Sequence, residues 1–152
     1  MEGVWLSLIL TGVFLTSGSG DTSKQIRPPA VSGYFYPSDP DELRRMVSEY
    51  LAKARKVETE GRLLALIVPH AGLKYSGSIA AEAFKQLEGR EDIKTVVIVA
   101  PSHYIPFKGI SVYKEGYYRT PLGLIEINSD LAEELIGIDP EMIRFYPPCL
   151  LY

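Results

Sequence analysis

The chain has 152 residues, of which 46% are hydrophobic and 23% are charged, and its formal net charge is −3. This length suits one ordinary domain, and the composition is that of a globular protein. Lysines and arginines are scattered along the sequence, so neither the net charge nor its pattern favours a nucleic-acid partner. Cys149 is the only cysteine, which excludes an intrachain disulfide framework and a Cys-x-x-Cys motif.

The first twenty residues differ in composition from the rest of the chain. Residues 4–16 are nearly all apolar, and the small residues Ser17 to Gly20 follow them. This run is shorter than the ~20 residues that span a bilayer, and it matches the central part of a secretory signal. Glu2, however, stands where a signal carries a positive charge. Two expectations follow: either residues 1–20 export the chain or anchor it by membrane contact, or they are a buried strand or a start-codon artefact in a cytoplasmic protein.

Residues 26–36 contain two prolines and a glycine, so they are predicted to be irregular, with the aromatic cluster at residues 34–36 packing on the domain. A helix is predicted to follow. Asp39 is its expected N-cap and Pro40 its first residue, because aspartate accepts from free helix N–H groups and proline needs no N–H partner there. Apolar residues then recur at helical spacing and form one core-facing side: Leu43, Met46, Val47, Tyr50, Leu51 and Ala54.

Two later stretches share one pattern, in which an aliphatic run meets a proline and then a histidine. They are residues 63–70, LLALIVPH, and residues 95–103, TVVIVAPSH. Uninterrupted aliphatic runs of this length are typical of strands buried on both faces of a parallel sheet. Proline ends such a strand because it cannot donate to the ladder. His70 and His103, the only histidines of the chain, are therefore predicted to follow the carboxyl ends of two strands.

The segment between these stretches predicts a connecting helix. Residues 71–78 are expected to form a loop that opens it, and Gly89 is expected to stop it. The predicted buried stripe comprises Ile79, Ala80, Ala83, Phe84 and Leu87. Strand, helix and strand in this order form a βαβ unit, whose strands are parallel. Because ligands bind at the carboxyl edge of such sheets, His70 and His103 are expected to converge there.

The remaining predicted elements are shorter. Residues 109–113 and 122–127 are strand candidates in a hairpin-like excursion or at a sheet edge, and Ser129 is the expected cap of a helix over residues 130–136. Residues 146–152 show no helix or strand period. The sequence thus predicts an α/β fold, mainly a parallel sheet with one βαβ unit and flanking helices.

Two histidines at one sheet edge are typical of metal chemistry, since neutral imidazole binds zinc, iron and copper. A working site also needs a third protein ligand and an open position for substrate. The alternative is that each histidine is structural or simply exposed, as most single histidines after a strand are. The residues alone leave both interpretations open.

Other site chemistries have less support. Ser102 beside His103 resembles a nucleophile and its base, but adjacent side chains on an extended segment point apart, and no Gly-x-Ser-x-Gly elbow is present. Cys149 with a histidine would form a thiol–imidazole pair, but it lies in the irregular end. The loop from Gly72 to Ser78 precedes a helix and suits an anion, yet it lacks the Walker pattern of nucleotide-binding loops.

Four separated motifs together resemble the Memo-like family, whose bacterial and archaeal members are called AmmeMemoRadiSam system protein B. They are SGYFYP at residues 32–37, VPHAGLKYSG at 68–77, APSH at 100–103 and YRTPLG at 118–123. The motifs keep the family's order, and the resemblance covers about residues 26–145.

This resemblance implies an α/β fold related to the class III extradiol dioxygenases, which use non-haem iron. The histidines of the family's Pro-His-Ala-Gly and Pro-Ser-His motifs are metal ligands, and these positions are His70 and His103 here. Iron or copper is the implied cofactor, and a dioxygenase-like redox reaction is the implied activity. The substrate is not identified by the resemblance.

Members of the family are nearly twice as long, and the resemblance places their third metal ligand in the second half. We therefore expect the N-terminal part of a Memo-like domain at residues 26–145, after a signal-like or anchor segment at 1–20 and a linker at 21–25, and before an irregular end at 146–152. An incomplete site follows from this expectation, because the ligand role does not transfer to Cys149. An inactive remnant of a broken gene is one alternative.

A non-catalytic alternative keeps the same fold. It is a module that holds a small molecule or a peptide without turnover. Its candidate pocket residues are Tyr34, Tyr36, Tyr75 and Arg119. Ligand binding that survives loss of both histidines would distinguish this module from a metal-dependent enzyme.

Overall fold

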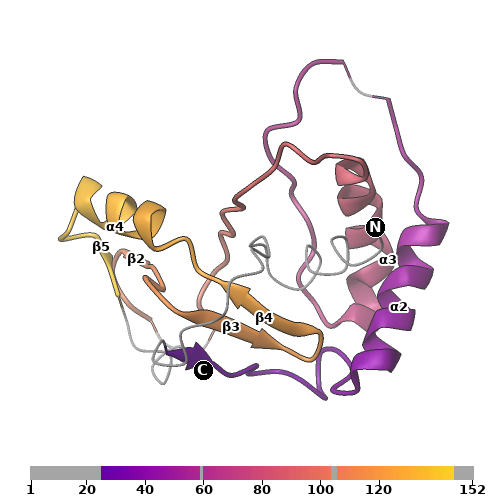
Figure 1. Cartoon of the computed structure of the whole chain (residues 1–152), viewed down its shortest axis with the longest axis horizontal. Coiled ribbons are helices and arrows are strands. Elements are labelled where there is room, and N and C mark those ends of the chain that lie inside the picture. Colours follow the sequence, from indigo (N-terminus) through magenta and orange to yellow (C-terminus); the bar gives the residue numbers. More distant parts are fainter. Residues whose placement is uncertain (1–24, 59, 104–105, 146–152) are drawn as a thin grey trace.

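The computed structural model describes residues 25–58, 60–103 and 106–145. These residues form helices and two small sheets, which confirms the α/β fold class (Figure 1). The signal-like or anchor segment and the irregular end, which includes Cys149, lie outside the described residues. Within the described ranges, no helix is long and apolar enough to cross a bilayer.

Helix α2 spans Pro40–Lys53 and begins where the sequence predicts. The carboxylate of Asp39 accepts a hydrogen bond from the N–H of Glu42 at 2.8 Å. A cap of this kind stabilises a helix by about 1 kcal/mol. Leu43 and Val47 are completely buried, so α2 turns its predicted apolar side to the core.

Helix α3 spans Leu73–Phe84 and continues into one 3-10 turn, η1, at Lys85–Leu87. The prediction of a loop over residues 71–78 is wrong for most of that range, because the helix starts directly after Gly72. Gly89 follows η1 with φ +83°, a left-handed conformation that ends a helical segment and favours glycine. The predicted end of the helix is thus close to the observed one.

Helices α2 and α3 approach each other closely because α3 is rich in small residues. A Cβ added at Gly77 would lie 2.6 Å from Cε2 of Tyr50 on α2, and Ala80 and Ala81 are buried. Ile79 differs from the prediction: it was assigned to the buried stripe, yet 63% of its surface is exposed. The face of α3 that packs on α2 is therefore the face with small residues, and the larger side chain points elsewhere.

Two short sheets complete the described fold. Strand β1 (Ile26–Arg27) runs parallel to β3 (Tyr117–Thr120), and β3 pairs antiparallel with β4 (Gly123–Glu126). Strand β2 (Ile110–Ser111) runs parallel to β5 (Ile143–Arg144). Both strand candidates of the sequence contain an observed strand, but β3 was predicted to be part of the connection between them.

Helix α4 spans Ser129–Ile138, and its N-cap is Asn128 rather than the predicted Ser129. The Oδ1 atom of Asn128 accepts from the N–H of Leu131 at 3.1 Å. Its Nδ2 atom donates to Oγ1 of Thr95 at 2.9 Å. Asn128 therefore both starts α4 and ties this helix to the segment that begins at Thr95.

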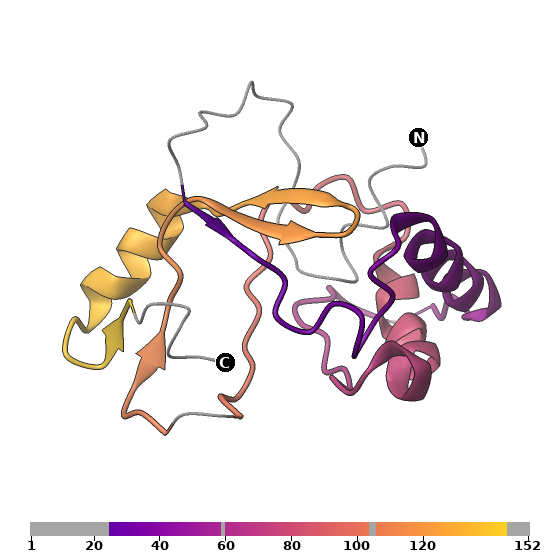
Figure 2. The same ribbon diagram turned by 90° about the horizontal axis from the view of Figure 1, so that it is seen from below.

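The elements are arranged in three groups along the molecule (Figures 1 and 2). Helices α2 and α3 lie side by side at one end, the hairpin of β3 and β4 lies in the middle, and α4 with β2 and β5 forms the other end. The connection between α2 and α3 first extends beyond the helices and then returns through the middle of the molecule, where the connection between η1 and β2 also runs.

Residues 63–70 and 95–103 contain no strand, so the described residues do not form the predicted βαβ unit as a paired sheet. Among these residues, 63–69 and 95–100 make no backbone–backbone hydrogen bond. Ile67 is fully exposed and Val99 is 93% exposed. The prediction assumed that both runs are covered on two faces, and the described part of the chain supplies no such cover.

Candidate functional site

The structure brings His70 and His103 together. Their Nε2 atoms are 3.2 Å apart, their ring centroids are 5.3 Å apart, and the ring planes are tilted by 39°. The rings therefore meet at their Nε2 corners rather than stacking face to face. A hydrogen bond between them needs one nitrogen as donor and the other as acceptor, so at least one imidazole is neutral. Both residues are exposed.

The start of α3 holds the segment that carries His70. Ser76, which is buried in the first turns of the helix, donates its hydroxyl to the carbonyl of Ala71 at 2.9 Å. The N–H of Leu73 donates to the carbonyl of Phe35 at 2.7 Å. These two hydrogen bonds fix the chain directly after His70 against the helix on one side and the 31–36 turn on the other.

His103 ends a segment whose beginning is attached to α4. Thr95 accepts the hydrogen bond from Asn128, which in turn caps α4. The two histidines therefore come from segments anchored at different ends of the molecule, one at α3 and one at α4. Their meeting is a tertiary contact across 33 residues of sequence.

The distance between the two Nε2 atoms suits a shared metal ion. Two nitrogens bound to one ion at about 2.0–2.1 Å with a tetrahedral angle lie about 3.3 Å apart, and the observed separation is 3.2 Å. Imidazole is a common ligand of iron, copper and zinc. Within the described ranges, no third His, Cys, Asp or Glu joins the pair. The described residues thus fit such an ion as two of its ligands.

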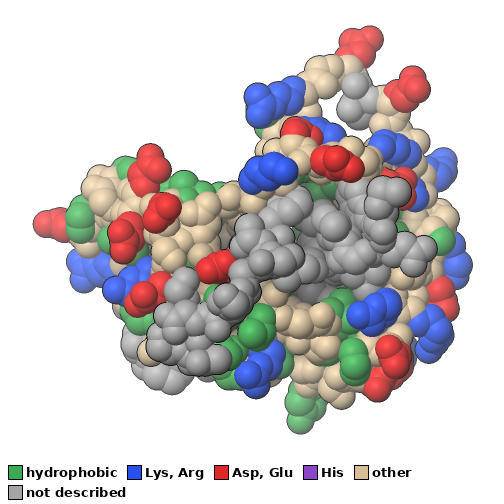
Figure 3. Space-filling view, viewed as in Figure 1, with side chains coloured by type: hydrophobic (Ala, Val, Ile, Leu, Met, Phe, Trp, Pro, Cys, Tyr) green, Lys and Arg blue, Asp and Glu red, His purple; other side chains and the backbone are tan. Residues whose placement is uncertain are grey.

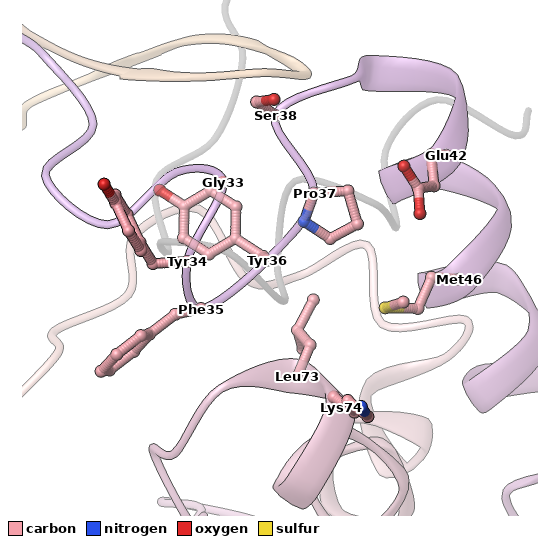
Figure 4. A pocket seen from close by; sticks show the side chains of 10 residues that line it. All are labelled: Gly33, Tyr34, Phe35, Tyr36, Pro37, Ser38, Glu42, Met46, Leu73 and Lys74. Atoms are coloured by element: carbon pink, nitrogen blue, oxygen red, sulfur yellow. The ribbon is translucent and has the colours of Figure 1, made fainter.

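A separate hollow of about 310 Å³ lies between the 33–38 turn and the starts of α2 and α3 (Figure 4). Tyr34 and Tyr36, two of the predicted pocket residues, contribute to its lining. Figure 4 shows Glu42 and Lys74 at opposite ends of it, with Met46 between them. Lys74 lies in the VPHAGLKYSG motif and Met46 on the predicted apolar side of α2. Neither of them nor Glu42 was predicted to line a pocket, because only the packing of the two helix starts brings the three residues together.

The other two predicted pocket residues lie elsewhere. Tyr75 is on α3 and 79% exposed, and Arg119 is exposed on β3. Neither contributes to the lining of the hollow. This hollow therefore contains two of the four predicted pocket residues, and a common pocket for all four stays a prediction.

In the part of the chain that the structure describes, the clearest pKa shifts lie in the connection that follows η1. Arg90 pairs with Asp92 through Nε–Oδ1 and Nη2–Oδ2 contacts of 2.7 and 2.8 Å. This two-pronged hydrogen bond lowers the pKa of Asp92 to about 2 and raises the pKa of Arg90. On the face shown in Figure 3, basic and acidic side chains are interspersed over the described surface, without a large patch of one sign.

These observations define an α/β protein that presents a pair of histidines at the ends of two aliphatic segments. Comparison with known proteins places it more closely. The family model described as "Memo-like protein" matches residues 27–145. The chain belongs to the Memo-like family, which confirms the resemblance drawn from the four motifs.

Several curated relatives agree with this assignment. A MEMO1 family protein of Methanocaldococcus jannaschii is 42% identical over 120 residues, which cover 73% of this chain and 42% of the relative. A MEMO1 family protein of Methanothermobacter thermautotrophicus is 39% identical over 117 residues, which cover 73% of this chain and 42% of the relative. A MEMO1 family protein of Pyrobaculum arsenaticum is 34% identical over 131 residues, which cover 80% of this chain and 47% of the relative. The chain therefore spans less than half the length of these relatives.

Proposed function

We propose that this chain contributes His70 and His103 as two ligands of a metal site in a dioxygenase-like redox protein, with iron or copper as the metal. One observation carries the proposal, namely the 3.2 Å separation of the two Nε2 atoms. Family membership supports it, because both histidines lie inside the matched range and inside the motifs that identify the family. The activity, like the metal, is a proposal for the whole family chain, of which this chain matches less than half.

The residues of this chain have distinct parts in that site. Each imidazole binds through a neutral Nε2 atom, because a protonated nitrogen has no lone pair to donate. Ser76 and Leu73 position His70 through the hydrogen bonds that fix the chain after it. Iron or copper held there would supply redox chemistry with oxygen or a phenolic substrate. The exposure of both rings leaves room beside them for further ligands and for substrate.

Metal titration of the purified chain tests the proposal. The dissociation constants for Cu²⁺ and Fe²⁺ are measured by calorimetry for the wild type, for His70→Gln, for His103→Gln and for the double variant. We expect each single substitution to weaken binding at least about tenfold, because chelation by two imidazoles is lost. Tyr34→Ala, at a side chain that is 90% exposed, is the control and should leave affinity unchanged. Binding that is insensitive to both histidines contradicts the proposal.

The hollow beside α2 and α3 favours a second candidate function, a non-catalytic module for a small molecule or a peptide. It offers the ring of Tyr36 and the thioether of Met46 as apolar surface, with the opposite charges of Glu42 and Lys74. A screen of short zwitterionic peptides by NMR tests this function. Binding that survives the double histidine substitution and is lost in Met46→Lys favours the module. The absence of any binding peptide, or binding that disappears with the histidines, contradicts it.

A further inference from the structure

The hollow between the starts of α2 and α3 carries one charge of each sign in its lining (Figure 4). Glu42 lies in the first turn of α2, and Lys74 is the second residue of α3. Among the residues that the structure describes, neither the carboxylate of Glu42 nor the ammonium group of Lys74 has a hydrogen-bond or salt-bridge partner. Both residues are exposed, so a ligand that enters the hollow can reach the two charges.

The sequences of the two helices explain why these charges have no partner. Side chains three or four positions apart on a helix are neighbours, but Arg45, three positions after Glu42, pairs with Glu49 at 3.3 Å instead. On α3, no acidic side chain lies in the first turn, and Glu82 accepts a hydrogen bond from the N–H of Arg55 at 3.0 Å. The two charged groups of the hollow therefore meet no competitor for a ligand on their own helices.

The surface between the two charges is apolar. Met46 follows Glu42 by one helical turn and lies between the two charged side chains in Figure 4, while Leu73 and Pro37 add apolar lining. An unbranched thioether side chain adapts to the shape of what it contacts. The volume of about 310 Å³ lies at the lower end of the range for small-molecule sites, which is about 300–1,000 Å³. The hollow thus suits a small ligand with an apolar middle and opposite charges at its two ends.

We infer that the hollow binds a small zwitterion in which an apolar stretch separates an ammonium group from a carboxylate group. The ammonium group of the ligand faces Glu42, its carboxylate faces Lys74, and the apolar stretch covers Met46. This inference rests on the ligand-binding module that is proposed above as the second candidate function. It adds to that module the charge pattern of the ligand and the direction in which the ligand lies.

Straight-chain compounds of matched length test the charge pattern. The zwitterions run from γ-aminobutyrate to ω-aminooctanoate, and the amine, the carboxylic acid and the alcohol of each length are the comparisons. Binding is followed through the NMR methyl signal of Met46 in the full chain, with the signal of Met142, just before β5, as the internal control. We expect the best zwitterion to bind at least about threefold more tightly than its three comparisons, because each exposed ion pair contributes modestly. Added salt should reduce this difference, since exposed charges are screened.

Charge reversal identifies the two residues. Glu42→Lys or Lys74→Glu alone should weaken binding of the best zwitterion at least about threefold, because one attraction becomes a repulsion. The double variant Glu42→Lys/Lys74→Glu keeps the net charge and should recover the affinity, because the ligand then binds in the opposite direction. Lys53→Glu is the matched control: it makes the same charge change at an exposed site on α2 outside the lining, and the affinity should not change. Circular dichroism checks that each variant keeps its helices.

The outcomes separate this inference from the second candidate function. If the alcohol shifts the Met46 signal with the same affinity as the zwitterion, the hollow is a site for apolar ligands, and only the inference is overturned. A double variant that binds as weakly as the single variants also overturns it. If no zwitterion of the series shifts the Met46 signal, the inference is wrong, whereas the module itself is decided by the peptide screen.

Discussion

The Nε2 atoms of His70 and His103 lie 3.2 Å apart, although the two histidines are 33 positions apart in sequence. Each histidine follows an aliphatic run and a proline, and each run is anchored separately, at α3 or at α4. The contact therefore depends on the relative placement of the two ends of the molecule. A change in the distance between the two imidazoles would therefore reveal a change in tertiary structure as well as in the candidate site.

The two histidines should respond to a metal as one unit. In a Zn²⁺ titration followed by NMR of the imidazole ring signals, both rings of the wild type should shift with the same dissociation constant, because one ion contacts both Nε2 atoms. In His103→Gln, the shift of His70 should need at least about tenfold more metal. Tyr75→Phe, at an exposed position on α3, is the control. Two rings that titrate at different metal concentrations in the wild type would contradict a shared site.

The meeting of the histidines was predictable from sequence, but by a route that the structure only partly follows. The prediction placed each histidine at the end of a buried parallel strand, whereas the described residues at 63–70 and 95–103 form no strand. The aliphatic pattern correctly identified two similar segments whose histidines meet. It could not show whether other parts of the protein cover these segments, because burial depends on residues far away in sequence.

Local signals were the most reliable part of the sequence prediction. Asp39 and Pro40 correctly predicted the start of α2, because the capping hydrogen bond joins residues that are only three positions apart in sequence. Ile79 shows the limit: helical spacing placed it in the buried stripe, but the close approach of α3 to α2 at Gly77 turns another face inward. The hollow between the starts of α2 and α3 could not be predicted either, because it depends on how these two helices pack.

Gly77→Ala should destabilise the chain by about 1–3 kcal/mol, because a Cβ at this position would overlap the ring of Tyr50 and the two helices would have to separate. The free energy of unfolding is measured by urea denaturation followed by circular dichroism. Gly137→Ala is the matched control, since it lies in α4 with no atom near the added Cβ. This second change should stabilise the helix by about 0.5–1 kcal/mol. Equal effects of the two substitutions would show that α2 and α3 are not in close contact.

Alanine substitutions at the start of α4 test whether Asn128, the observed N-cap, or Ser129, the predicted one, stabilises the helix. Asn128→Ala should cost about 1–2 kcal/mol of stability, because it removes both the cap and the hydrogen bond to Thr95. Ser129→Ala should stay within about 0.5 kcal/mol. Thr95→Val removes the hydroxyl that accepts from Asn128 but leaves the cap on Leu131, so its cost isolates the contact between α4 and the segment that leads to His103. If Ser129→Ala is the more damaging of the two alanine substitutions, the cap assignment is wrong.

The pair of Arg90 and Asp92 gives a prediction about pH. Because Arg90 stabilises the charged carboxylate, the pKa of Asp92 lies at about 2, below its ordinary value of 3.8. A carboxyl group whose pKa is lowered on folding contributes stability above its ordinary pKa and loses that contribution as the pH falls through the folded value. The contribution should be small because Asp92 is exposed.

Carbon-detected NMR titration should show the low pKa of Asp92 in the wild type and a return of this pKa toward 3.8 in Arg90→Ala. Arg62→Ala, which removes the other cation that acts on Asp92 but leaves the hydrogen-bonded pair intact, should change the pKa of Asp92 less than Arg90→Ala does. An equal response to both substitutions would mean that charge in general, rather than the hydrogen bond, sets the pKa.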